Sequence, residues 1–78
     1  MKLLTKAFVF INVDSSVEKE TLARLRALSE VKELYSVYGL YDVVAVLETH
    51  SMGKLKEAVT QKVRTVDGVK STITTILV

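Results

Sequence analysis

The sequence predicts a small α+β domain with a ferredoxin-like β-α-β-β-α-β order of elements. Four runs rich in β-branched or aromatic residues predict strands, and two segments with apolar residues at helical spacing predict helices. With right-handed crossovers, both helices cover one sheet face, strands one and three lie centrally and strands two and four form the edges. The 78 residues contain no proline or linker, so we expect one domain over residues 1–78.

The first strand and the first helix are predicted in the N-terminal third of the chain. Residues 7–13 read Ala-Phe-Val-Phe-Ile-Asn-Val, which is typical of a strand. We expect Ser15 or Ser16 to cap the helix, because Ser15 and Glu18 have the spacing of a capping box. The helix is expected to end near Ser29. Its residues at helical spacing are Val17, Thr21, Leu22, Leu25 and Leu28.

The rest of the chain predicts two consecutive strands, a second helix and a last strand. Residues 31–38 and 43–49 have strand character, and Gly39-Leu40-Tyr41-Asp42 is expected to form a turn between them or the tight start of the next strand. Ser51 is the expected N-cap of the second helix, and a turn at Asp67-Gly68 precedes the last strand, residues 69–78. The apolar positions of the second helix are Met52, Leu55, Ala58, Val59 and Val63.

The two central strands are predicted to be apolar on both faces, because successive strand residues point to opposite sides. In the first strand Val9, Ile11 and Val13 oppose Phe8 and Phe10, and in the third Val44 and Val46 oppose Val43, Ala45 and Leu47. Two helices cover only one face, and an exposed apolar face usually marks an interaction site. We expect a second subunit to pack there through a twofold interface. The alternative is that loops or helix tips cover this face.

Composition limits the classes of function. Eleven basic and nine acidic residues give a net charge of +2, which is not the concentrated charge of a dedicated nucleic-acid binder. With no cysteine and one histidine, the chain has no disulfide or thiolate site, and we expect no metal and no cofactor. The start is charged too early for a signal peptide, and no apolar run approaches about 20 residues. We therefore expect a cytoplasmic protein that has no membrane partner.

The turn and the last strand carry a resemblance to a known family. The Gly-x-Tyr-Asp pattern at residues 39–42, the apolar third strand and the stretch Gly-Val-Lys-Ser-Thr-Ile-Thr-Thr-Ile-Leu at residues 68–77 resemble the RAM domain. This domain is the effector-binding and assembly half of the Lrp/AsnC transcriptional regulators. The resemblance covers residues 7–78. Tyr38 departs from it, because the family often has a small hydroxyl residue at this position.

The resemblance implies a function as well as a fold. It implies a non-enzymatic, ligand-binding homodimer whose sheets pack face to face, and which assembles further into an octamer or decamer. Amino-acid effectors would bind at contacts between dimers. The implied ligand-binding residues are Gly39, Leu40, Tyr41, Asp42, Thr72 and Thr74. Too few residues precede the first strand for a helix-turn-helix, so we expect a stand-alone module without direct DNA binding. The resemblance also implies association with full-length Lrp/AsnC regulators.

Each implied ligand residue also has a structural interpretation. Backbone N–H groups at Gly39 can hold a carboxylate, or the glycine can simply serve the turn. The Asp42 carboxylate can pair with an α-ammonium group, or it can cap the turn through its own side chain. The hydroxyls of Thr72 and Thr74 can bind a polar ligand, although threonine is also a good strand former.

The remaining aromatic and titratable residues point to contacts rather than to catalysis. Tyr35, Tyr38 and Tyr41 recur every third residue, and we expect at least one of them to contact another subunit. His50 follows a strand and precedes a helix cap, which is typical of a surface histidine, and it has no nucleophile beside it in sequence. We predict no catalytic residue.

Two other classes of function remain as alternatives. One is a dimeric α+β barrel enzyme, such as a small monooxygenase or isomerase, which would need a polar cavity between sheet and helices. The strands offer almost no polar residue to line such a cavity, and Asn12 is the exception. Single-stranded RNA could stack on Phe8 and Phe10 of the open sheet. The third strand contains no aromatic residue, and this speaks against RNA binding.

Overall fold

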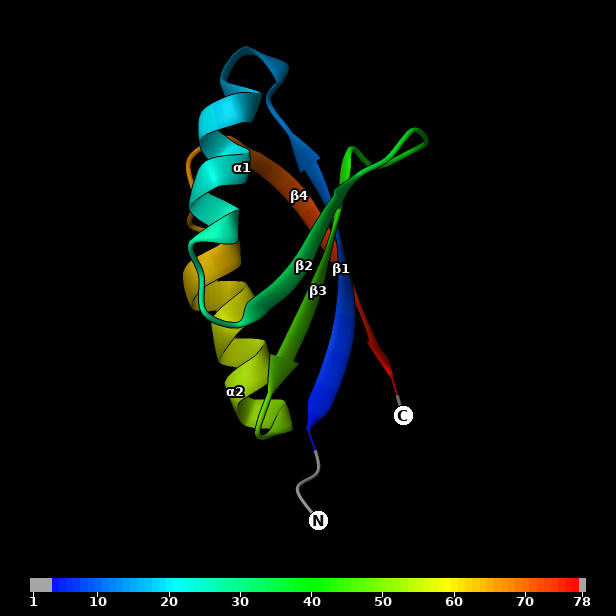
Figure 1. The fold of residues 1–78 in the computed structure, drawn as a ribbon, viewed down its shortest axis with the longest axis vertical. Coiled ribbons are helices and arrows are strands. Elements are labelled where there is room, and N and C mark those ends of the chain that lie inside the picture. The colour runs from blue at the N-terminus through cyan, green and yellow to red at the C-terminus, as the bar shows by residue number, and fades with distance from the viewer. Residues whose placement is uncertain (1–3, 78) are drawn as a thin grey trace.

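The computed structural model describes residues 4–77, so residues 1–3 and Val78, the predicted end of the last strand, lie outside the described part. Within it the chain forms one antiparallel sheet of order β2-β3-β1-β4. Both helices pack on the same face (Figure 1). The strands are β1 Thr5–Val13, β2 Val31–Ser36, β3 Val43–Thr49 and β4 Val69–Leu77. The helical segments are η1 Ser15–Val17, α1 Glu18–Arg26, α2 Met52–Glu57 and η2 Ala58–Val63. The predicted α+β fold, the element order and the strand order are confirmed.

The hydrophobic core lies between the sheet and the helices. In β1 every second residue from Ala7 to Val13 is buried, and Ile11 pairs with Val43 on one side and Thr72 on the other. The opposite face carries Phe8 and Phe10, which are half-buried. The core residues are Ala7, Val9, Ile11, Val13, Leu25, Val43, Ala45, Leu47, Leu55, Ala58, Val59 and Val63. The predicted division of β1 and β3 into two apolar faces is therefore confirmed.

The start of the first helix differs from the prediction. The Asp14 carboxylate accepts hydrogen bonds from the backbone N–H of Ser16 at 3.0 Å and from its hydroxyl at 2.8 Å. This side chain caps the single 3-10 turn η1, and α1 begins three residues later without a side-chain cap. The predicted serine cap is wrong because Asp14 reaches the free N–H groups first, two residues ahead, as aspartate does in Asx turns.

Two element ends also differ from the prediction. The first helix ends at Arg26, because Leu28 N donates to the carbonyl of Leu25 at 3.2 Å and tightens the last turn before β2. Strand β2 ends at Ser36, two residues early, because Val37 N donates to the Asp42 carbonyl at 2.9 Å. This bond closes a loop over residues 37–42, so Tyr38 lies in the loop rather than in the strand.

The second helix begins as predicted and then widens. The Ser51 hydroxyl accepts from Lys54 N at 3.1 Å, which confirms it as the N-cap of α2. Beyond Glu57 the helix continues as the π-helical segment η2, where Arg64 N donates to the carbonyl of Val59 five residues back. Together α2 and η2 span the region predicted as one helix.

Candidate functional site

The β2–β3 loop projects away from the helices at one end of the sheet (Figure 1). We refer to its residues Gly39–Asp42 as the corner. Gly39 has φ +152°, and a Cβ built on it would meet no atom within 4 Å. Leu40 is 91% exposed and Tyr38 is fully exposed. The corner therefore offers backbone and side-chain surface that no other part of the described chain covers.

Asp42 anchors this corner to the central strand. Its Oδ2 accepts a hydrogen bond from the backbone N–H of Val13 at 2.9 Å, and its own N–H donates to the carbonyl of Ile11 at 3.0 Å. The carboxylate thus has a structural role, but with a strand end rather than within its own turn. A carboxylate has about four acceptor positions, so Asp42 retains capacity for a ligand's ammonium group.

A hollow of about 440 Å³ lies on the inner side of the corner and is lined by Glu18, Ser36, Val37, Tyr38 and Asp42. Its lining includes two carboxylates and no cationic side chain. Sequence reasoning missed Glu18 and Ser36 as site residues, because the first was interpreted as part of a helix cap and the second as a strand position. Only the folded topology brings the first turn of α1 beside the β2–β3 loop.

The structure places Thr72 and Thr74 away from the corner. Thr72 pairs with Ile11 and Thr74 with Val9, so both lie on β4, across β1 from β3. Two strand spacings separate β3 from β4, which is about 10 Å. The corner residues Gly39–Asp42 and the two threonines therefore lie toward opposite edges of the sheet and do not line one hollow within a single chain.

The sheet face opposite the helices is an open apolar surface. The Tyr41 ring packs against Phe10 with a centroid separation of 5.9 Å and a tilt of 49°, which extends the surface toward the corner. Tyr35, Ile73 and Leu77 are each about half exposed, at 52%, 51% and 42%. We refer to the following residues as the open face: Phe8, Phe10, Tyr35, Tyr41, Val44, Val46, Ile73 and Leu77. Within residues 4–77 neither helix covers this face, although Tyr41 of the β2–β3 loop packs on Phe10 and Val46 is only 6% exposed.

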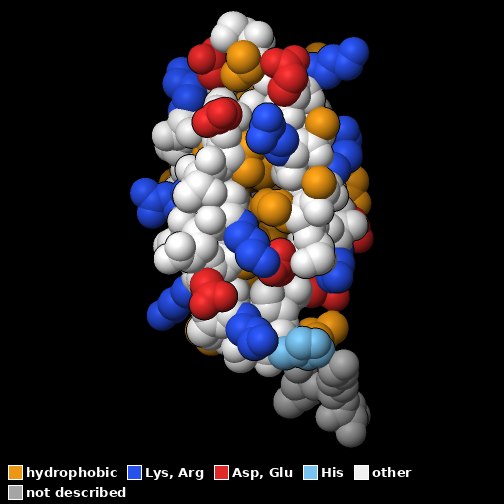
Figure 2. Space-filling model, turned by 90° about the vertical axis from the view of Figure 1, so that its left-hand side faces the viewer, with side chains coloured by type: hydrophobic (Ala, Val, Ile, Leu, Met, Phe, Trp, Pro, Cys, Tyr) orange, Lys and Arg blue, Asp and Glu red, His pale blue; other side chains and the backbone are white. Residues whose placement is uncertain are grey.

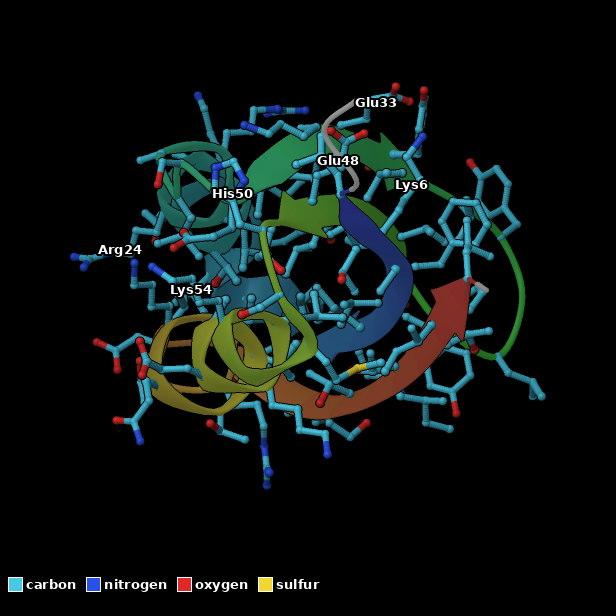
Figure 3. All side chains as sticks on the ribbon, turned by 90° about the horizontal axis from the view of Figure 1, so that it is seen from below. Lys6, Arg24, Glu33, Glu48, His50 and Lys54 are labelled. Atoms are coloured by element: carbon cyan, nitrogen blue, oxygen red, sulfur yellow. The ribbon has the colours of Figure 1, made fainter. Side chains whose placement is uncertain are left out.

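The charges on this face are few and partly paired. Lys6 lies 3.4 Å from Glu48 on the neighbouring strand, and Glu33 stands near the same edge (Figure 3). These three residues sum to one negative charge. Phosphate contacts dominate nucleic-acid affinity, so this sheet face is poorly suited to RNA despite its aromatic residues.

The polar residue that the enzyme alternative depends on points away from the core. Asn12 lies on the same face as Phe10, and its Nδ2 donates to the Ser71 hydroxyl at 3.0 Å in an exposed bond. The buried polar side chains in the described part of the chain are Thr21 and Thr49, and both hydroxyls donate to backbone carbonyls. Asn12 therefore does not build a polar cavity between sheet and helices.

His50 is an exposed residue at the end of β3, close to Lys54 at the start of α2 (Figure 3). Within residues 4–77 no three histidine, cysteine, aspartate or glutamate side chains lie close enough together to hold a metal ion. None of the helices described is both long and apolar enough to cross a bilayer.

A hollow of about 690 Å³ lies on the helix side between α1 and η2. Its floor includes Leu28 and Val66, and apolar side chains are visible there among charged ones (Figure 2). Lys62 and Glu30 form an ion pair of 2.6 Å at this hollow. The Lys62 ammonium holds the pKa of the Glu30 carboxyl below its usual value. None of the predicted site residues lines this hollow.

Comparison with known proteins identifies relatives over nearly the whole chain. Residues 6–78 match the model of the Lrp/AsnC ligand binding domain. A search of curated proteins finds no significant match. Among solved structures, a Thermus thermophilus protein has a TM-score of 0.89 and 31% identity, covering 95% of this chain and 92% of that one.

Two further structures show the same likeness at different lengths. A Pyrococcus horikoshii protein has a TM-score of 0.86 and 34% identity, covering 95% of this chain and 89% of that one. AsnC of Escherichia coli has a TM-score of 0.89 and 28% identity, and here 95% of this chain covers only 50% of AsnC. The chain thus spans half of AsnC but most of the two shorter relatives.

Proposed function

Because the chain belongs to the Lrp/AsnC ligand-binding domain family, whose members are regulatory, we propose that it is a non-enzymatic module that senses an amino acid. The ligand-binding residues would be Gly39, Leu40, Tyr41 and Asp42 of the corner, together with Thr72 and Thr74 of β4. In this proposal the ligand changes how copies of the chain assemble, and assembly in turn regulates transcription or amino-acid metabolism.

The separation of these two groups of residues carries the proposal. The α-ammonium nitrogen and the α-carboxylate carbon of an amino acid are only about 2.5 Å apart. The corner and the threonines lie about 10 Å apart across β1. The ammonium and carboxylate of one amino acid are therefore much closer to each other than the two groups of residues are within one chain. A second copy that brings its β4 edge to the corner of the first would complete the site.

The open face supports a homodimer as the first step of assembly. Phe8, Phe10, Val44 and Ile73 form its centre, and both helices lie on the other face of the sheet. A twofold axis through this face would pair each sheet with its copy and remove the apolar area from water. The corners and β4 edges would then remain at the rim, where further dimers can dock to form an octamer or decamer.

The proposal also includes association with other members of the family. We propose that the chain acts in the cytoplasm by mixing with full-length Lrp/AsnC regulators. The described part of the chain contributes the shared assembly surfaces for this. This partnership can be tested by co-purification from cells that express both the chain and such a regulator. If neither protein is recovered with the other, the result counts against the partnership.

Thermal unfolding with a panel of the 20 amino acids tests the sensing function. A ligand that binds only the native state must raise the melting temperature. We expect one amino acid, or one chemical class of them, to do so in the wild type and not in Asp42→Ala. A panel without any response, at concentrations up to about 10 mM, contradicts amino-acid sensing and leaves the assembly role to be tested separately.

A further inference from the structure

A second hollow, of about 350 Å³, lies at the outer edge of β4 and is lined by Arg64, Val69, Lys70, Ser71 and Thr72. Two of these five side chains are cations, two carry hydroxyls and none is a carboxylate. Arg64 comes from the end of η2, whereas the other four are consecutive residues of β4. The fold therefore places a guanidinium beside an edge strand that carries an ammonium and, on its helix side, the Thr72 hydroxyl.

The two cations are available to a ligand. The ion pairs within residues 4–77 are Lys6–Glu48 and Lys62–Glu30, so neither Arg64 nor Lys70 is paired within 4 Å. Asp14 is an acidic residue that interacts electrostatically with Lys70. The pKa of Asp14 is lowered first by its hydrogen bonds from Ser16 and only to a smaller extent by the Lys70 charge. Both of those bonds go to Oδ1.

One of the two hydroxyls shares the helix side of β4 with Arg64. The Ser71 Oγ accepts from Asn12 Nδ2 at 3.0 Å on the face that also carries Phe10, so Ser71 borders the hollow from the other side of the strand. Thr72 pairs with Ile11 on the helix side of β4, beside η2. The carbonyls at the end of η2 would repel an anion, but those of Lys62 and Val63 are already bonded to the Thr65 hydroxyl and to Val66 N.

We propose that this hollow, which we call the β4 anion site, binds a small oxyanion, that is, a carboxylate or a phosphate group. Guanidinium and ammonium groups form charge-assisted hydrogen bonds with such groups, and the planar Arg64 fork can hold two oxygens at once. The proposal goes beyond amino-acid sensing, because it names an anionic ligand group and the two cations that recognise it. It also stands if no amino acid binds at the corner.

The test is calorimetric titration of the full chain with inorganic phosphate and, separately, with malonate, at constant ionic strength set with chloride. The double variant Arg64→Gln/Lys70→Gln should weaken the binding of the preferred anion about tenfold or more. Lys19→Gln/Lys56→Gln makes the same charge change on exposed helix positions and should weaken it less than twofold. Asp14→Asn keeps a capping side chain and should bind the anion more tightly.

The two anions separate the possible sources of the ligand group. Tighter binding of malonate identifies a carboxylate ligand, and tighter binding of phosphate identifies a phosphorylated one. Equal weakening in both double variants would show that only net charge matters and would overturn the site. Failure of both anions to bind the wild type at 10 mM would overturn it as well. Circular dichroism of each variant verifies that these exposed substitutions leave the fold intact.

Discussion

The Asp42 carboxylate accepts a hydrogen bond from the backbone N–H of Val13, 29 residues earlier in the chain, at 2.9 Å. This bond ties the corner of the β2–β3 loop to the last residue of the central strand β1. Asp42, a candidate ligand-binding residue of the corner, is therefore also the residue that fixes the corner's position. The two roles can be separated, because the bond to Val13 needs only an acceptor, whereas an ammonium ligand needs a negative charge.

Asp42→Asn and Asp42→Ala should separate anchoring from ligand binding. Asparagine keeps an acceptor for the Val13 N–H, so we expect it to lower the free energy of unfolding by no more than about 1 kcal/mol. Alanine leaves that N–H without its partner and should cost about 1–2 kcal/mol. Both variants should lose the thermal response to an amino acid. Urea unfolding together with the amino-acid panel measures both effects. A full response in Asp42→Asn would show that the carboxylate charge does not hold the ligand.

Gly68→Ala should be the most destabilising of the glycine substitutions. Gly68 has φ +95°, and an added Cβ would lie 2.1 Å from the Thr21 hydroxyl oxygen, which itself bonds to the Asp67 carbonyl. Strain and collision together should cost about 2 kcal/mol or more. Gly53→Ala is the matched control, because the nearest atom to its Cβ is 4.0 Å away and alanine favours the helix. A loss below 0.5 kcal/mol in Gly68→Ala, by analogy with ordinary surface changes, would contradict this close packing.

Ile73→Lys should break the proposed dimer without unfolding the chain. Ile73 is 51% exposed and lies on the open face opposite Phe10, so lysine meets water in one copy but a second apolar sheet in the dimer. Lost burial in both copies should raise the dissociation constant about 100-fold or more. Sedimentation at several concentrations measures this shift. Ala23→Lys adds the same charge to an exposed helix position and should leave the mass unchanged, and equal behaviour of the two variants would argue against this face as the interface.

The ion pair between Glu30 and Lys62 should make stability depend on acid pH. Lys62 lowers the pKa of Glu30 in the folded chain. The pair therefore stabilises the fold above the usual pKa of a glutamate, and this contribution is lost as the pH falls from about 5 through the lowered value. Because the Lys62 side chain is 44% exposed, we expect less than about 1 kcal/mol.

Glu30→Gln should remove that part of the pH dependence. Urea unfolding at pH 7 and pH 3 would give a smaller difference for Glu30→Gln than for the wild type, and Glu57→Gln, an exposed change on α2, would match the wild type. High salt should reduce the wild-type difference as well, since surface charges are screened. An unchanged pH dependence in Glu30→Gln would mean that the pair contributes nothing to folding.

The sequence carried enough information to predict the strands, because their inward and outward residues alternate clearly. Val9 and Phe10 fall on opposite faces as predicted, and Ser51 caps α2 because its hydroxyl lies where the free N–H groups need it. The cap before α1 was predicted wrongly, since Asp14 and the two serines all have capping side chains. Local sequence does not decide which of three such neighbours reaches the first free N–H.

The candidate site was less predictable, because it depends on which segments meet in space. The residues Gly39–Asp42 adjoin in the sequence and therefore lie together. Thr72 and Thr74 are separated from them by the central strand, a relation that only the register of β1 with β3 and β4 reveals. Glu18 and Arg64 have no sequence signal of their own, since each is one charge among many on an amphipathic helix.

Light scattering on a sizing column tests the central claim most directly, namely that a second copy covers the open face. One chain has a mass of 8.7 kDa. We predict a mass of at least twice this value at micromolar concentration, and a change in mass or in its concentration dependence when the amino acid that raises the melting temperature is added. A stable mass of one chain, with and without amino acids, would contradict both the interface and a ligand site that a second copy completes.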